Sequence, residues 1–444
     1  MPGELTSESV PDVPSPSTNP VGAVAAAVLA ATAGVVATAV WGRALLRDGA
    51  ELFVSAPPFA GSWEWRWPLG MWAVVVLAVS IVVLWPEVVR AARWGALLVG
   101  SLAVSLAWTA ALASSAGGGV ADPLLTRFEY LPYARRVGSP SQLLSHWVER
   151  LPDAPTHVQG HPPGTVLAFL GLDRLGVGDT AAGWIVLVLG ASAAPAALIA
   201  MGHLAGRDTA RRAAVFVGLA PAVVWAGTSV DGAVMGVVAW ATAAVAIAVT
   251  AEERAVAVGS GLASGLLVGS VATATYGAPA LVVPWAVLLV WALWRRRPVP
   301  VVAAAAGVLV PLLLLAAAGF DWVGGFEATR AAYRAGVASV RPSGYFAVAN
   351  LAVLAVAAGP ATVAGIVGLR DRRVWMLVGG AVIGALLADL SGLSKGEVER
   401  IWLPLVPFLV VGTAGLRGDV PRRAWLGAQL AVAVVLQAWL RSPW

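Results

Sequence analysis

Acidic, basic and imidazole side chains are concentrated in residues 121–164, within a chain that is otherwise rich in Ala, Val, Leu and Gly. The carboxylates Asp122 and Glu129 are followed closely in this segment by Arg135 and Arg136. A carboxylate can take a proton from a hydroxyl group, while arginines bind an oxyanion such as phosphate. The combination predicts a general base beside an anionic leaving group. The alternative is a solvated loop that carries ordinary surface charges.

Two of the four histidines of the chain, His157 and His161, lie in the same segment. Their spacing would place both rings on one face of a helix, as in some metal sites. Pro162 and Pro163 follow directly, and proline suits the first turn of a helix. We therefore expect "HPPG" to begin a short helix and expect no metal centre, although a divalent metal as cofactor stays open.

A second charged group, "SKGEVER", lies at 394–400 and includes Lys395, the single lysine of the chain. A lysine and an arginine at headgroup depth can receive a lipid phosphate, or they can simply anchor a helix end. Two acids accompany the two bases in this short loop, which favours a binding role for the group: Lys395, Glu397, Glu399 and Arg400. A third feature, "SWEWRWP" at 62–68, suits either a sugar face or a membrane anchor.

The composition sets the class of protein that must position these residues. Of 444 residues, 59% are hydrophobic and 12% are charged, and the chain has no cysteine. Repeated uncharged stretches of about 20 residues are typical of a polytopic membrane protein. We count 13 such stretches: 21–41, 69–85, 95–114, 181–203, 213–230, 232–250, 255–276, 277–294, 298–318, 345–368, 374–390, 401–416 and 424–440. The sequence thus predicts an all-α fold, with three spans in 21–114 and ten in 181–444, after a disordered cytoplasmic tail at 1–20.

The stretch 165–176 decides the orientation of everything after it. Its 12 residues would make a helix of about 18 Å, which is too short to cross a bilayer. If this helix stays outside, every short arginine-rich turn falls on the cytoplasmic side, as the positive-inside rule requires. The N-terminus is then cytoplasmic and the C-terminus extracytoplasmic. The segments expected on the outer side are 42–68, 115–180, 319–343 and 391–400.

The order of these features resembles the GT-C superfamily of polytopic glycosyltransferases, in an actinobacterial form. "RFEYLPY" looks like the acidic motif of the first outer loop, and "GHPPGTVLAFLGLDRLG" looks like its Pro-Pro juxtamembrane helix. "LAPAVVWAGTSVDGAVM" is similar to the span that returns to the outer face, ending here near Asp231. "ERIWLPLVPFLVVGTAGL" resembles the late segment near the lipid phosphate. The acidic motif departs from the family in having a single carboxylate, with Phe128 where an Asp often stands.

The resemblance implies transfer of a sugar, such as mannose or arabinose, from a polyprenyl-phosphate donor to a glycan, lipid or protein acceptor. It implies inversion by direct displacement at the outer face of a bacterial plasma membrane. Glu129 would be the base, with Asp122 as the alternative. The residues that would bind substrate or lipid phosphate are Tyr130, Arg135, Arg136, His161, Asp231, Lys395, Glu397, Glu399 and Arg400.

Two other classes of function remain. A flippase or transporter for a lipid-linked precursor predicts charged residues through the spans, and the cores of the 13 stretches lack them. A non-catalytic membrane scaffold predicts no clustering of acids and bases in outer loops. The net charge of +5 in so apolar a chain reflects loop orientation, so we expect the bilayer and not a nucleic acid as partner.

Overall fold

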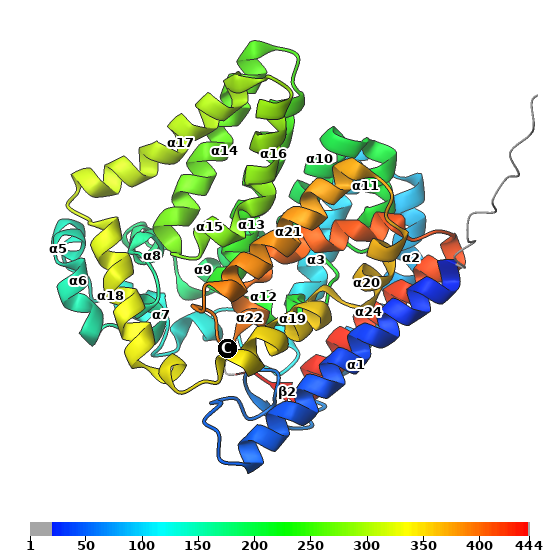
Figure 1. Cartoon of the computed structure of the whole chain (residues 1–444), viewed down its shortest axis with the longest axis horizontal. Coiled ribbons are helices and arrows are strands. Elements are labelled where there is room, and N and C mark those ends of the chain that lie inside the picture. Colours follow the sequence, from blue (N-terminus) through cyan, green and yellow to red (C-terminus); the bar gives the residue numbers. More distant parts are fainter. Residues whose placement is uncertain (1–19, 443–444) are drawn as a thin grey trace, which may run out of the picture.

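The computed structural model describes residues 20–442 and is built almost entirely from helices (Figure 1). The expected disordered tail lies outside the described residues, except for Pro20, which begins the first helix. The N-terminal quarter consists of α1 (Pro20–Arg47), β1 (Ser62–Trp63), α2 (Gly70–Ala91) and α3 (Trp94–Ser114). β1 pairs antiparallel with β2 (Leu440–Arg441), so the end of the last helix lies beside the loop after α1.

Only short helices occupy the segment between α3 and the next long helix. They are η1 (Asp122–Leu125), α4 (Tyr130–Ala134), α5 (Pro140–Ser145), α6 (Trp147–Arg150), η2 (Leu151–Asp153), α7 (Thr156–Gln159) and α8 (Gly164–Arg174). The short helix expected after "HPPG" is α8. It has 11 residues, about 16 Å of helix, and a turn with positive φ at Gly176 follows it.

Longer helices make up most of the remaining chain. Its first half contains α9 (Asp179–Ala191), α10 (Ala193–Ala205), α11 (Arg207–Ala214), α12 (Val223–Ala226), α13 (Val230–Thr250), α14 (Arg254–Ala274), α15 (Ala278–Leu281), α16 (Val283–Trp294) and α17 (Pro298–Ala317). Its second half contains α18 (Trp322–Ala335), η3 (Val337–Ser339), α19 (Ser343–Ala358), α20 (Pro360–Gly368), α21 (Arg372–Leu390), α22 (Val398–Ile401), η4 (Leu403–Leu405), α23 (Val406–Val410), η5 (Val411–Gly415) and α24 (Asp419–Trp439).

Eight helices in residues 20–442 are long and apolar enough to cross a membrane, which identifies a multi-pass membrane protein. They are Val21–Arg47, Gly70–Ala91, Trp94–Ser114, Asp179–Ala205, Val230–Thr250, Arg254–Ala274, Pro298–Ala317 and Arg372–Leu390. A ninth span exists if α19 and α20, which meet at a 90° bend, are counted together. The other stretches expected to span are short or broken helices, or, for α24, a helix that is less apolar.

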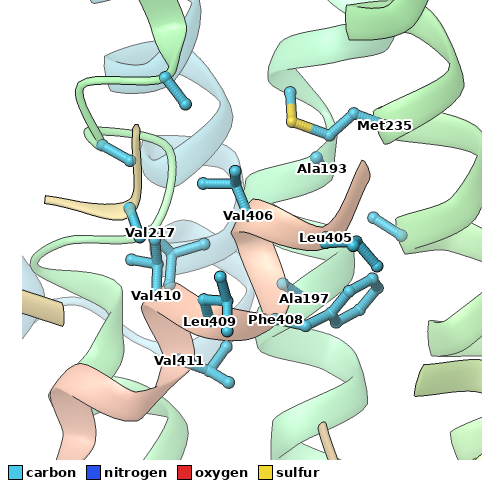
Figure 2. Packing of buried hydrophobic residues seen from close by; sticks show 14 of the residues in the cluster. Ala193, Ala197, Val217, Met235, Leu405, Val406, Phe408, Leu409, Val410 and Val411 are labelled. Atoms are coloured by element: carbon cyan, nitrogen blue, oxygen red, sulfur yellow. The ribbon is translucent and has the colours of Figure 1, made fainter. Parts of the chain in front are cut away.

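Proline explains one of the broken stretches, 401–416. Pro404 and Pro407 lack the amide hydrogen that a regular helix needs, and the segment divides into η4, α23 and η5. Its apolar side chains are nevertheless among the most deeply buried in the chain, with Leu405, Phe408 and Val411 fully enclosed. Figure 2 shows them packed against Ala193 and Ala197, whose small side chains let the broken segment approach closely.

Arginine-rich turns meet at one face of the molecule, which we call the arginine face: 89–94, 204–212, 249–254, 295–297, 369–373 and 414–423. Guanidinium groups donate to backbone carbonyls at helix ends in neighbouring turns, where the helix dipole favours a positive charge. These donations run from Arg211 to Ala92, from Arg212 to Ala414, from Arg297 to Val249 and from Arg373 to Leu204. The turns expected on the cytoplasmic side therefore share one face.

The four segments expected on the outer side, 42–68, 115–180, 319–343 and 391–400, also meet, at a face we call the loop face; α1 continues to Arg47, so the first of these loops begins at 48. In Figure 1, α5 to α8 and α18 lie together at one side of the molecule. Hydrogen bonds join the four segments in pairs: Ala60 to Glu399, Leu52 to Arg341, Gln159 to Thr329, and Ala338 to Lys395. Whatever chemistry these loops carry is therefore assembled from distant parts of the chain.

Candidate active site

A buried carboxylate and a buried imidazole form the centre of the loop face. Glu129 immediately precedes α4, and His157 lies on α7, which a hydrogen bond from the His157 amide to the Phe128 carbonyl holds beside it. The Nδ1 of His157 is 2.8 Å from Oε1 of Glu129. Only 8% of the His157 side chain and 11% of the Glu129 side chain are exposed. This pair joins residues 28 positions apart.

The arginine of α22 completes the pair from the far end of the sequence. Nη2 of Arg400 is 3.4 Å from Nε2 of His157. A guanidinium can only donate, so Nε2 accepts and the ring proton is assigned to Nδ1, which donates to Glu129. His157 thus bridges the guanidinium of Arg400 and the carboxylate of Glu129.

A second carboxylate holds the arginine in place. Nη1 of Arg400 is 3.2 Å from Oδ2 of Asp231, and the two side chains are 6% and 14% exposed. Asp231 lies in the first turn of α13, where the helix dipole favours a negative charge. Four residues from three distant segments thus form one connected network, the outer cluster: Glu129, His157, Asp231 and Arg400.

Tyr130 and His161 pack beside the outer cluster. Nδ1 of His161 lies 2.8 Å from the Tyr130 hydroxyl and 2.9 Å from the His157 carbonyl. Burial, followed by the positive charge of Arg400, lowers the pKa of His161 to about 3. Burial and the carboxylates of Asp231 and Glu129 raise the pKa of Tyr130 well above its ordinary value. Both side chains are therefore neutral at physiological pH and serve as hydrogen-bonding groups.

A cavity of about 290 Å³ opens beside Glu129 and His157. The other residues that line it are Ala113, Ala116, Gly118, Gly119, Asp122, Pro123, Thr126 and Phe128. Oε1 of Glu129 is held by His157, while Oε2 is buried without a hydrogen-bond partner in the described part of the chain. Asp122 borders the same cavity, but it is exposed and its carboxylate accepts a 2.7 Å hydrogen bond from the Gly119 amide.

An adjoining cavity of about 520 Å³ shares Ala113, Ala116 and Pro123 with the first. Arg66 and Trp67 of the "SWEWRWP" segment line it. Rings of this segment stack on one another: Trp67 contacts both Trp65 and Trp72, and Trp65 also contacts Trp439. The Nε1 of Trp67 is buried and has no hydrogen-bond acceptor among residues 20–442. The segment therefore provides a cation and a donor group next to the cavity beside Glu129.

Glu399 lies next to Arg400 in the chain and is 1% exposed. Its Oε1 accepts a 2.9 Å hydrogen bond from the Ala60 amide, and burial raises the pKa of the carboxyl to about 7. Glu397 is more exposed and accepts a hydrogen bond from Arg341 at 3.4 Å. Both acids tie α22 to the other loops, and neither borders the two cavities.

Three predicted phosphate-binding cations have other partners in the structure. Arg135 pairs with Asp173 and Asp179 on an exposed surface. Arg136 is exposed with its guanidinium over the Tyr133 ring. The ammonium of Lys395 donates to the carbonyls of Ala338 and Arg341, which ties 391–400 to 318–342. Arg400 is the predicted cation that the structure brings to Glu129.

The sequence interpretation omitted His157 from the site and chose His161. The structure gives His157 the central position, because it lies between Glu129 and Arg400 and contacts both. The signal in the sequence was the spacing of the two histidines, since Nδ1 of His161 lies 2.9 Å from the His157 carbonyl oxygen. Within residues 20–442, no three His, Asp or Glu side chains gather in a way that could hold a metal ion.

Comparisons with known proteins add no relative. No protein-family model matches the chain, and no curated protein sequence matches it.

Proposed function

We propose that this chain is a GT-C-like membrane glycosyltransferase that moves a sugar from a polyprenyl-phosphate donor to an extracytoplasmic acceptor. The observation that supports this most strongly is the state of Glu129. Glu129 lines a cavity, one of its carboxylate oxygens is fixed by His157, and the other is buried with no hydrogen-bond partner among residues 20–442. A carboxylate held in this way is suited to take a proton from a hydroxyl group in the cavity.

The proposed reaction is a single displacement. Glu129 removes the proton of the acceptor hydroxyl as its oxygen attacks the anomeric carbon of the donor sugar. The bond from that carbon to the phosphate oxygen breaks, and polyprenyl phosphate leaves with the electron pair. Attack from the face opposite the phosphate inverts the anomeric configuration. His157 holds Glu129 in position through the 2.8 Å hydrogen bond between its Nδ1 and Oε1.

Arg400 supplies a positive charge that reaches the base through His157. Asp231 balances this charge in the protein without substrate. The role of Arg400 is therefore to hold His157 in position beside Glu129. Arg66, at the adjoining cavity, is the cation placed to meet the phosphate of the donor. The two joined cavities fit a reaction with two substrates. The buried carboxylate of Glu129, with one oxygen that lacks a partner among residues 20–442, favours an enzyme over a scaffold, because a scaffold has no need of such a group.

We further propose 13 crossings of the membrane, with the arginine face in the cytoplasm and the loop face outside. The broken segment 401–416 supports this, because Arg400 lies at the loop face and Ala414 at the arginine face. The segment 213–230 likewise connects Arg212 at the arginine face with Asp231 at the loop face. Crossing by bent or broken helices is tolerated where other helices surround them. A bacterial plasma membrane is the proposed location.

The direct test is transfer of label from polyprenyl-phosphate sugars, with mannose and arabinose donors supplied separately, by the purified protein in bacterial lipid. Acceptors are supplied as a lipid and glycan extract. We expect a labelled product that forms in proportion to the protein and has the anomeric configuration opposite to the donor. Retained configuration would contradict the proposed displacement. A folded protein that transfers from neither donor would contradict the proposed donor class.

A further inference from the structure

A cavity of about 140 Å³ opens at the arginine face, and none of the residues that line it belongs to the outer cluster. We call it the arginine pocket. Its lining is dominated by guanidinium groups: Pro86, Val89, Arg90, Asp208, Arg211, Arg212, Val215, Arg422 and Arg423. The charged residues come from α2, α11 and α24, so three separate helices contribute charge to one small space.

Two of these arginines have only neutral partners in the described residues. Arg211 donates to the carbonyls of Val89 and Ala92, the latter at 2.9 Å. Arg212 donates to the Ala414 carbonyl and to the Thr209 hydroxyl. Carbonyl and hydroxyl groups fix the position of a guanidinium without cancelling its charge. Both side chains are half-buried, so their charges are held in place and partly shielded from water.

Acidic residues balance only part of the positive charge at the arginine pocket. Asp208 lines the cavity itself. Glu87 lies beside it and is shared by Arg90, at 2.6 Å, and Arg423. Leaving Arg422 aside, the described side chains bring four arginines (Arg90, Arg211, Arg212 and Arg423) together with two carboxylates (Asp208 and Glu87), which gives a positive excess around a space large enough for a phosphate group. Such an arrangement is a binding site for an oxyanion.

The surface next to the arginine pocket is apolar and exposed. The pocket lies at the C-terminal end of α2, one of the eight candidate spanning helices. Exposed valine and leucine side chains lead away from it along this helix: Val76, Val79, Val83, Leu84 and Val88. An anion that carries acyl chains can place its phosphate among the arginines and its chains along α2.

We propose that the arginine pocket binds the headgroup phosphate of an anionic phospholipid. Basic pockets between spanning helices on the cytoplasmic side are suited to such headgroups. The shared chemistry is a phosphate oxyanion, and free inorganic phosphate would use the same guanidinium groups. The apolar path along α2 favours the lipid. This site is independent of the proposed sugar transfer, because it lies on the other face and uses none of the same residues.

The test measures lipid binding to the full-length purified protein by native mass spectrometry and by thermal unfolding. Phosphatidylglycerol, phosphatidylcholine and inorganic phosphate are titrated separately. We expect phosphatidylglycerol to remain bound and to raise the unfolding temperature, and phosphatidylcholine and inorganic phosphate to have little effect. The double variant Arg211→Gln/Arg212→Gln should weaken phosphatidylglycerol binding about 30-fold. Arg135→Gln, which changes an exposed arginine on the loop face, is the matched control.

A second variant guards against loss of folding in the double variant. Asp208→Asn removes a negative charge from the arginine pocket and leaves every arginine in place, so it should tighten phosphatidylglycerol binding about threefold. Equal phosphatidylglycerol affinity in all variants would overturn the assignment. Equal stabilisation by inorganic phosphate would also overturn it, because the occupant would then be the free ion and not a lipid.

Discussion

The outer cluster and the arginine pocket both gather charge from distant segments, but they hold that charge in different ways. In the outer cluster, Arg400 is 6% exposed in its side chain and is held by Asp231 and by His157. In the arginine pocket, Arg211 and Arg212 are half-buried and donate to backbone carbonyls and a hydroxyl. The first arrangement fixes the orientation of each side chain, and the second leaves a net positive charge beside an open cavity.

This difference separates a site suited to chemistry from a site suited to binding. A general base needs a defined tautomer beside it and a defined field, which buried side-chain pairs supply. A headgroup site needs excess charge and access from the membrane surface.

The largest effect on stability is expected from removal of Arg400. Arg400→Met leaves Asp231 buried without its cation, which should lower the free energy of unfolding by about 3 to 5 kcal/mol. Chemical unfolding in detergent micelles followed by tryptophan fluorescence would measure this. The control is Arg135→Met, whose exposed pairs with Asp173 and Asp179 should contribute less than about 1 kcal/mol. Equal losses in the two variants would mean that Arg400 is no more than a surface charge.

The next effect concerns Glu399 and pH. Its pKa is about 7 in the folded protein, against an ordinary value of 4.5. The folded state therefore keeps a proton that the unfolded chain has lost, so stability decreases as pH rises from 4.5 to 7 and is level above that. The decrease amounts to about 3 kcal/mol. Glu399→Gln should remove this decrease from an unfolding curve measured at several pH values. An unchanged pH profile would show that Glu399 ionises freely.

A smaller effect is expected at the second cavity and depends on the proposed function. Trp67→Phe keeps an aromatic ring but removes the unpartnered Nε1 hydrogen. If this hydrogen binds substrate, KM should rise about three- to tenfold with kcat nearly constant. Trp65→Phe is the matched control, because Trp65 is 61% exposed. A loss of kcat without a change in KM would argue against a binding role for Trp67.

The all-α membrane class was predictable from the sequence, because it depends on composition and on uncharged runs of residues. The number of regular membrane-spanning helices could not be predicted from hydropathy. Hydropathy cannot show that prolines divide 401–416 into short pieces, since the pieces stay apolar and buried. It also cannot show the 90° bend between α19 and α20.

The site could be predicted only in part. Ionisable residues stand out in an apolar chain, which is why Glu129, Asp231 and Arg400 were chosen. The sequence cannot tell which cations would already have partners: Arg135 is near Glu129 in sequence but pairs with Asp173 and Asp179, while Arg400 is 271 positions away and joins the site. Pairing across such separations is decided by packing, which also made His157 the bridge.

The most direct test of the central claim, that Glu129 is the base, is a comparison of sugar-transfer rates for the wild-type protein, Glu129→Gln and Asp122→Asn. Glu129→Gln keeps the size of the side chain and removes its basicity. The account predicts that it transfers at least about 100-fold more slowly while it expresses and folds normally, and that Asp122→Asn stays close to the wild-type rate. Full transfer by Glu129→Gln, or loss of transfer in Asp122→Asn alone, would contradict it.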